Sequence, residues 1–386
     1  MKSRLLLLAF SAKALTSFAQ TELSEQATIS LMTVAPGNML YSLFGHSALR
    51  VHDPIRQLDR CYNYGTFDFE DPNFLLNFCR GRLRYYLDME PYRYFEYGNW
   101  LEQRPMKEQV LHLSPQQRQL LFELLEDNAR EENRYYLYDF FYDNCATRIR
   151  DVVEKALFYQ ITFDTTFLPL GITMRRLLHP YLEGHPWTRF GIDLVLGQPA
   201  DRIASGRDFM FLPDYLHDAF ARATVGDSVA LVMEERYPIG PYAALQRTNA
   251  AGGSWSHPLW VMCLVAAIGL ASLFSRRAEI AFDVLFWFAL GLAGLILFLL
   301  WFATDHGATK YNWNLLWAMP THLLFFWRTK RTELTETYFT VVGAIALVTL
   351  ILWGVIPQDL PETALPVVVL AAVKGLMRRY RREEPI

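Results

Sequence analysis

The sequence predicts an α+β exported domain followed by an all-α membrane bundle of about five helices. The prediction rests on the uneven distribution of a hydrophobic content of 52%. Residues 20–254 mix polar and apolar positions as soluble domains do, whereas residues 255–386 contain five apolar segments. A linker at residues 249–254 separates the two parts. The net charge of −3 at pH 7 does not indicate a nucleic-acid partner.

The N-terminus has the organisation of a signal peptide. Lys2 and Arg4 precede a short apolar run, and residues 17–19 offer a small-residue cleavage site. No cysteine follows this site, so it is not a lipoprotein signal. We therefore predict that residues 1–19 are a signal peptide and that residues 20–254 are exported to the periplasm.

Two strands are predicted early in the exported domain. Residues 42–52 alternate, with Phe44, His46, Ala48 and Arg50 on one face of the strand. Residues 61–69 form a second candidate strand that contains a glycine break.

A helix with a cysteine in its first turn is predicted to start near residue 144. Asp143 or Asn144 can cap it, because a short polar side chain accepts a free backbone N–H. The apolar positions share the face that carries Cys145; they are Ile149, Val152, Val153, Ala156 and Leu157. The helix dipole, Arg148 and Arg150 would favour a thiolate. Cys145 is therefore a candidate nucleophile, although a buried structural cysteine is the commoner fate of a lone thiol.

A cysteine nucleophile needs an adjacent base or a lowered pKa. Among the histidines of the exported part, His46 is the best candidate, because small residues beside it leave room for a substrate. A histidine satisfied within the sheet is the alternative. His46 and His52 are too far apart on one strand to share a metal ion. With no HExxH or CxxC pattern, we predict no metal and no cofactor.

The other cysteines give no second nucleophile. Cys263 falls in an apolar segment, where we expect a packed thiol. Cys61 and Cys79 either form a disulfide in an oxidising compartment or are two buried free thiols.

The apolar segments predict five membrane spans, at residues 257–275, 282–304, 313–327, 337–356 and 363–377. The third and fifth are also short enough to be buried core helices. Basic residues cluster at the ends of the first, third and fifth segments, whereas the two intervening loops hold only Lys310. Because positive residues stay cytoplasmic, we predict a multi-pass inner-membrane protein with a periplasmic N-terminal domain and a cytoplasmic C-terminus.

This topology places the loop at residues 303–314 on the periplasmic side, facing the exported domain. It is dense in polar groups at the mouth of the bundle, where such groups are costly unless paired or used. Asp305 and His306 can act in acid–base chemistry, and Thr309, Asn312 and Asn314 can bind a head group. A capped turn whose polar groups satisfy one another is the alternative.

Three stretches resemble the exported domain of the Lnb family: residues 44–51, 62–69 and 143–151. The polar loop at residues 303–314 is similar to the membrane half of that family. The order of His46 before Cys145 is similar to the circularly permuted branch of the NlpC-type papain-like fold. Relatives of lecithin:retinol acyltransferase belong to that branch and use a cysteine thioester. One departure is that Ala146-Thr147-Arg148, and no histidine, follows the cysteine.

The resemblance implies a circularly permuted papain-like exported domain and a lipoprotein N-acyltransferase. Its partners would be the membrane, a phospholipid acyl donor and a diacylated lipoprotein acceptor. Cys145 would be the acyl-accepting nucleophile, His46 its base and Asn63 the group that orients the histidine. Tyr62, Tyr64 and His52 are alternatives for the third role. We expect substrate contacts from Asn144, Arg148, Asp305, His306, Thr309, Asn312 and Asn314.

Two other functional classes are compatible with the same residues. A membrane-anchored cysteine peptidase or amidase of the cell envelope would use the same cysteine and histidine, but it would not need five spans. A non-enzymatic sensor or scaffold would hold both residues in its core.

Overall fold

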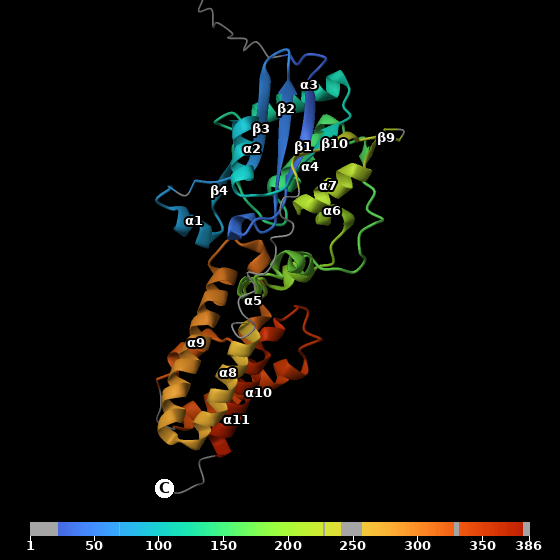
Figure 1. The fold of residues 1–386 in the computed structure, drawn as a ribbon. Coiled ribbons are helices and arrows are strands. Elements are labelled where there is room, and N and C mark those ends of the chain that lie inside the picture. The colour runs from blue at the N-terminus through green and yellow to red at the C-terminus, as the bar shows by residue number, and fades with distance from the viewer. Residues whose placement is uncertain (1–21, 69, 227, 241–256, 328–331, 381–386) are drawn as a thin grey trace, which may run out of the picture.

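The computed structural model describes residues 22–68, 70–226, 228–240, 257–327 and 332–380. A sheet-rich N-terminal part stands on a helical C-terminal part (Figure 1). This arrangement confirms the predicted order of a mixed α/β region followed by a helical region. The predicted signal peptide and the linker at residues 249–254 lie outside the described residues.

The N-terminal part is organised around a seven-stranded sheet with the order β10-β5-β1-β2-β3-β4-β6. Every neighbouring pair is antiparallel. The strands are β1 (Thr28–Val34), β2 (His46–Asp53), β3 (Leu58–Thr66), β4 (Arg84–Pro91), β5 (Met106–Leu111), β6 (Tyr135–Leu137) and β10 (Val232–Ile239).

Helices cover both faces of this sheet. Leu49 and Tyr62 face the main core, which they share with α3 (Pro115–Asn128) and α4 (Cys145–Ala156). Ala48 and Cys61 point to the opposite face, where they pack with Tyr92 and Phe95 of α2 (Tyr92–Leu101). The alternation of strand residues between the two faces follows from the period of two along a strand.

The remaining elements of this part are η1 (Leu40–Ser42), α1 (Phe74–Arg80), η2 (Arg176–Leu182), α5 (Pro186–Val195), η3 (Gln198–Asp201), α6 (Gly206–Phe209) and α7 (Pro213–Arg222). Of these, α7 packs beside the sheet in the main core, and α5 lies between the sheet and the bundle (Figure 1). A small second sheet contains β7 (Ile161–Thr162), β8 (Thr224–Val225) and β9 (Val229–Ala230).

The first predicted strand is four residues too long at its start, because it begins at His46 and not at residue 42. Gly45, with φ of 79°, turns the chain into β2. A Cβ atom there would lie 2.9 Å from the carbonyl oxygen of Val34, so both the conformation and the space require glycine. The second predicted strand is observed as β3, shifted toward the N-terminus.

Four helices build most of the membrane part: α8 (Pro258–Ala271), α9 (Arg276–Phe302), α10 (Glu333–Ile351) and α11 (Leu365–Tyr380). Of the described residues, α9 and α10 are the helices long and apolar enough to cross a membrane by themselves. In Figure 1 the beginning of α9 and the end of α11 lie at the end of the bundle away from the sheet. That orientation agrees with the predicted placement of the basic residues.

The third predicted span is wrong as a continuous helix. Residues 313–327 contain two short 3-10 turns, η8 (Trp313–Leu316) and η9 (Pro320–Leu324), with Pro320 at the start of the second. Buried His322 helps to satisfy the freed polar groups: its Nε2 lies 3.2 Å from the Trp317 carbonyl oxygen and its Nδ1 lies 2.7 Å from the Tyr338 hydroxyl. Irregular backbone is tolerated in a membrane bundle where protein groups satisfy it in this way.

The broken segment lies directly against α9 because two glycines leave room for it. A Cβ atom at Gly291 would lie 2.9 Å from the backbone nitrogen of Leu323. A Cβ atom at Gly294 would overlap the carbonyl oxygen of Ala318. The close approach therefore depends on the absence of a side chain at these positions.

Replacing Gly294 with alanine should destabilise the bundle by about 1–3 kcal/mol, the usual cost of overpacking a tight interface. Thermal unfolding of the purified protein in detergent measures the change. Gly354→Ala is the matched control, because nothing lies within 4 Å of a Cβ atom at that position. Equal melting temperatures for the two variants would contradict the proposed close contact.

Candidate functional site

Cys145 is the first residue of α4, and Asn144 caps the helix. The Asn144 Oδ1 atom accepts hydrogen bonds from the backbone N–H groups of Ala146 (2.9 Å) and Thr147 (3.0 Å). The Thr147 hydroxyl accepts from the Asn144 N–H at 2.8 Å, which closes a capping box. The predicted capped helix start is therefore present, and it places Cys145 at the margin of the main core.

The thiol reaches the end of the sheet where β2 and β3 separate. The β2–β3 pairing ends at Leu49 and Tyr62, before Ser47 is reached. The Ser47 N–H is near enough to the Cys145 thiol to act on its pKa. Gly65, with φ of 91°, allows β3 to bend there, and a Cβ atom at this glycine would be 3.5 Å from the Cys145 Cβ. The Cys145 side chain thus lies beside the residue that follows His46.

His46 belongs to a chain of polar contacts that crosses three strands. Its Nε2 atom lies 3.3 Å from the Asn63 Oδ1 atom. Asn63 donates through Nδ2 to the Glu90 Oε1 atom at 2.8 Å. Because this contact orients the amide oxygen toward the imidazole, Nε2 must carry the proton for a hydrogen bond to form. The Nδ1 atom of His46 is then free to accept a proton.

Burial favours the uncharged forms of the Cys145 thiol and the His46 imidazole. It raises the pKa of the Cys145 thiol, although the Ser47 and Ala146 N–H groups and the Arg104 charge act in the opposite direction. Burial, assisted by the charge of Arg104, lowers the pKa of His46 to about 4, while the contact with Asn63 opposes the change. At neutral pH the site therefore holds a thiol and a neutral imidazole, which suits a general base that acts during attack.

The reaction of Cys145 with iodoacetamide should reflect these pKa shifts. Because the pKa of Cys145 is raised, alkylation should be slow at pH 7 and should accelerate about tenfold per pH unit up to pH 9. Mass spectrometry of the alkylated protein, with Cys145→Ala as the control, measures the rate. A rate independent of pH between 5 and 8 would instead indicate a preformed thiolate–imidazolium pair.

The two arginines expected to stabilise the thiolate form ion pairs with carboxylates. Arg148 forms a two-pronged pair with Asp143 at 2.6 and 2.8 Å, and its guanidinium lies over the Tyr136 ring. Arg150 donates to Asp151 and to the carbonyl of Arg207. Arg104 is the charged group that lowers the pKa of Cys145 in the structure, and the effect expected from Arg148 and Arg150 stays a prediction.

Three of the predicted substrate contacts have structural roles. Asn144 is buried, with its Nδ2 bound to the carbonyls of Phe140 and Phe211. Asn312 and Asn314 are also buried, and both donate to the carbonyl of Leu194 at the end of α5. These amides are occupied by backbone groups and are not available to a substrate.

Asp305, His306 and Thr309 do line a cavity. Its volume is about 250 Å³, and Phe44, Gly81 and Tyr138 contribute to the wall on the side of the sheet domain. Phe44 lies two residues before His46, and Tyr138 lies near Cys145, since a Cβ atom at Gly65 would be 3.5 Å from the Cys145 Cβ and 3.8 Å from the Tyr138 ring. The cavity therefore extends from the mouth of the membrane bundle toward the cysteine.

Comparison with known families agrees with this organisation. The Lnb N-terminal periplasmic domain matches residues 16–179, and the Lnb transmembrane domain matches residues 254–383. The chain belongs to the Lnb family. It is accordingly a membrane protein with a periplasmic N-terminal domain. Comparisons with curated proteins and with solved structures found no match. The predicted papain-like permutation stays a prediction.

Two groups near the cysteine of this Lnb protein were not found by sequence reasoning. Glu90 orients Asn63, and the register that pairs Asn63 with Asp88 brings it there. Arg104 is buried and influences both Cys145 and His46. No local pattern marks either residue, because their positions depend on strand pairing and on the turn before β5.

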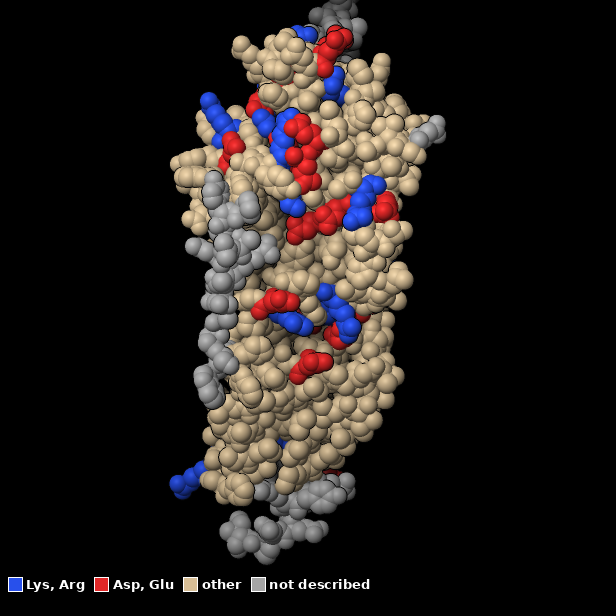
Figure 2. All heavy atoms as spheres, turned by 45° about the vertical axis from the view of Figure 1, so that its right-hand side comes forward, with Lys and Arg blue, Asp and Glu red and all other residues tan. Residues whose placement is uncertain are grey.

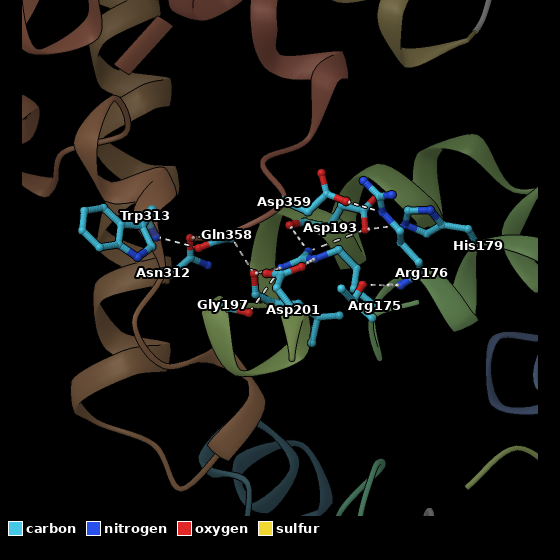
Figure 3. Close-up of polar contacts among 12 residues, drawn as sticks. Arg175, Arg176, His179, Asp193, Gly197, Asp201, Asn312, Trp313, Gln358 and Asp359 are labelled. Carbon is cyan, nitrogen blue, oxygen red and sulfur yellow. Dashed lines mark hydrogen bonds and ion pairs between the residues drawn. The ribbon is translucent and has the colours of Figure 1, made fainter. Parts of the chain in front are cut away.

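The junction with the membrane part is built by residues 175–201, which include the end of the first Lnb match and the start of the segment after it (Figure 3). Arg175 is 1% exposed and lies at its centre. Its guanidinium binds both carboxylate oxygens of Asp201, at 2.7 and 3.0 Å. It also donates to the carbonyls of Asp193 (2.8 Å), Leu196 (2.9 Å) and Gly197 (3.3 Å). A single side chain thus sets the shape of the turn after α5.

The membrane part binds this turn through its periplasmic loops. The contacts are Gly197 N–H to the Ala308 carbonyl (2.8 Å), Asn312 Nδ2 to the Leu194 carbonyl (2.8 Å) and Gln358 Nε2 to the Leu196 carbonyl (3.1 Å). Beside them a cleft of about 550 Å³ is lined by charged residues, including Arg176, His179 and Asp359. Figure 2 shows charged side chains at this level and over the sheet domain, whereas the bundle below is nearly free of them.

Proposed function

We propose that this Lnb protein is a lipoprotein N-acyltransferase. It moves a fatty acyl chain from a phospholipid through a Cys145 thioester to the N-terminal amine of a diacylglyceryl-cysteine lipoprotein. The observation that carries the proposal is the approach of Cys145, at a helix N-terminus, to the strand residues around His46, above a membrane bundle.

In the first step, the Cys145 sulfur attacks the ester carbonyl of the phospholipid while His46 accepts the thiol proton. The ester C–O bond breaks, and the proton passes to the departing lysophospholipid oxygen. The Cys145 N–H, in the first turn of α4, has no intrahelical partner and is suited to bind the oxyanion.

In the second step, the uncharged lipoprotein amine attacks the thioester carbonyl. The C–S bond breaks, an amide forms, and a proton from the amine returns to the sulfur. His46 carries this proton from the amine to the sulfur, and Asn63 again orients the imidazole. The buried, aromatic surroundings of the cysteine disfavour water as a competing acceptor, since Tyr85, Tyr136 and Tyr138 lie near the thiol.

The cavity between the loop at residues 305–309 and Tyr138 supports a lipid as the donor. Its walls are largely apolar, and Asp305 and His306 stand at its rim toward the membrane part. We propose that these two residues contact the polar head group while the acyl chain reaches toward Cys145. An envelope peptidase or amidase needs neither a lipid-accessible cavity nor a multi-helix anchor.

Intact mass spectrometry after incubation with phospholipid tests the proposal. We expect an added fatty-acyl mass that hydroxylamine removes and that is absent from Cys145→Ala. Adding a synthetic diacylglyceryl-cysteine peptide should then transfer the same mass to the peptide amine. No adduct with any phospholipid would exclude the acyltransferase, and cleavage of a peptidoglycan peptide would favour the amidase.

A further inference from the structure

Helix α1 (Phe74–Arg80) has an apolar face that the rest of the described protein does not cover. None of its seven residues is buried. Leu75 and Leu76 are 70% and 51% exposed, and the Cys79 side chain is exposed as well. These three residues share one face, because positions three and four apart are neighbours on a helix.

The position of α1 is set by the membrane part together with the end of the sheet, where Phe74 stacks on Phe67, the residue after β3. The Asp305 N–H donates to the Arg80 carbonyl at 2.9 Å, and His306 Nε2 lies 3.0 Å from the Phe78 carbonyl. Arg82 forms an ion pair with Asp305. Asp305 comes three residues after the end of the spanning helix α9 at Phe302. Helix α1 therefore lies at the level where the span leaves the hydrocarbon.

Glycine at position 81 makes this contact possible. Gly81 has φ of 71° at the C-terminal cap of α1. A Cβ atom there would lie 2.8 Å from the His306 backbone nitrogen, so a side chain would push α1 away from the loop. The same glycine lines the cavity that extends toward Cys145.

A second exposed apolar segment lies at the same end of the sheet domain. Met39, Leu40 and Tyr41 are all exposed, and η1, which contains two of them, leads into β2 and His46. Figure 1 shows α1 and the start of β2 at the end of the sheet that faces the bundle. Arg80 and Arg84 add positive charge beside α1, whereas the charge of Arg82 is paired with Asp305. Apolar residues flanked by arginines are typical of helices that lie in a lipid interface.

We propose that α1 and residues 39–41 rest in the periplasmic surface of the bilayer and present phospholipid to the cavity lined by Phe44, Gly81 and Tyr138. The lipid contact follows from the position of α1 beside the end of α9, whereas the delivery of a donor rests on the proposed acyltransferase function. The positive charge of the arginines is attracted to the lipid phosphates, and the apolar face formed by Leu75 and Leu76 is placed to contact the acyl chains below them.

Fluorescence quenching in nanodiscs tests the lipid contact without requiring activity. A bimane probe is attached to Cys79 of the full chain carrying Cys145→Ala and Cys263→Ser. The nanodiscs contain phosphatidylethanolamine, phosphatidylglycerol and an acyl-chain spin-labelled lipid. The matched control carries the probe at Ile55→Cys with Cys79→Ser; Ile55 is 62% exposed in the β2–β3 turn at the other end of these strands.

We expect the spin-labelled lipid to quench the probe at Cys79 at least threefold more strongly than the probe at position 55. Equal quenching at the two positions would overturn the lipid contact. This readout stays valid even if the protein forms no thioester, so the failure of the inference and the failure of the proposed function are distinguishable.

A double variant, Leu75→Glu with Leu76→Glu, tests lipid delivery. Thioester formation from bilayer phospholipid should slow at least tenfold, whereas formation from a water-soluble p-nitrophenyl ester should be unchanged. Ile55→Glu should affect neither donor. An unchanged rate with bilayer phospholipid, or equal losses with both donors, would overturn the delivery role.

Discussion

His46→Ala should slow formation of the Cys145 thioester by about 10²–10⁴-fold, the range usual for the loss of a positioned general base. The reason is the uncharged resting state of the site. Burial raises the pKa of Cys145, so little thiolate forms without a base at neutral pH. Single-turnover mass spectrometry with a phospholipid donor measures the rate.

His52→Ala is the matched control for this experiment. His52 lies on the same strand, β2, but pairs with Thr28 and Asp59 at the end away from Cys145. Its removal should leave the rate within about twofold. Asn63→Ala should give an intermediate loss, since the imidazole stays but the amide that orients it is gone. A full rate in His46→Ala would assign the histidine a structural role.

Arg175→Met should destabilise the protein by about 3–5 kcal/mol, as expected when one partner of a buried ion pair is removed. The methionine would leave the buried Asp201 carboxylate without its two guanidinium contacts. It would also leave the carbonyls of Asp193, Leu196 and Gly197 without this donor. The turn that they shape is the one bound by the periplasmic loops, so the two parts should separate more easily.

Thermal unfolding in detergent and limited proteolysis between the two parts measure this effect. Arg176→Met is the matched control: its side chain is largely exposed, and it forms a surface pair with Asp359 across the same junction (Figure 3). Exposed pairs contribute little, so the control should melt close to the native protein. Similar melting temperatures for both variants would show that the Arg175 network does not hold the junction.

The sequence by itself predicted the elements whose signals are local. The alternation at His46, Ala48 and Arg50 indicated β2, because residues of a strand point alternately to its two faces. The cap at Asn144 and the apolar period after Cys145 indicated α4 for the same kind of reason. Long apolar segments and the placement of basic residues indicated the bundle and its orientation.

The third predicted span shows a case in which the local sequence pattern did not predict the backbone conformation. Residues 313–327 are apolar enough for a helix, but Pro320, His322 and the close approach to Gly294 produce a broken chain. That outcome depends on which backbone groups the neighbouring helices can satisfy. Composition does not contain this information.

Motifs in the sequence identified the Lnb family, whereas the roles of Cys145 as nucleophile and of His46 as its base stay predictions. Only the tertiary structure decided which groups surround them. Strand pairing brings Glu90 to Asn63. The turn before β5 brings Arg104 near the cysteine. The side-chain amides of Asn144 and Asn312 bind backbone carbonyls and are therefore not available to bind a substrate. Such contacts join residues far apart in the chain, and their geometry exists only after the sheet and the bundle have packed.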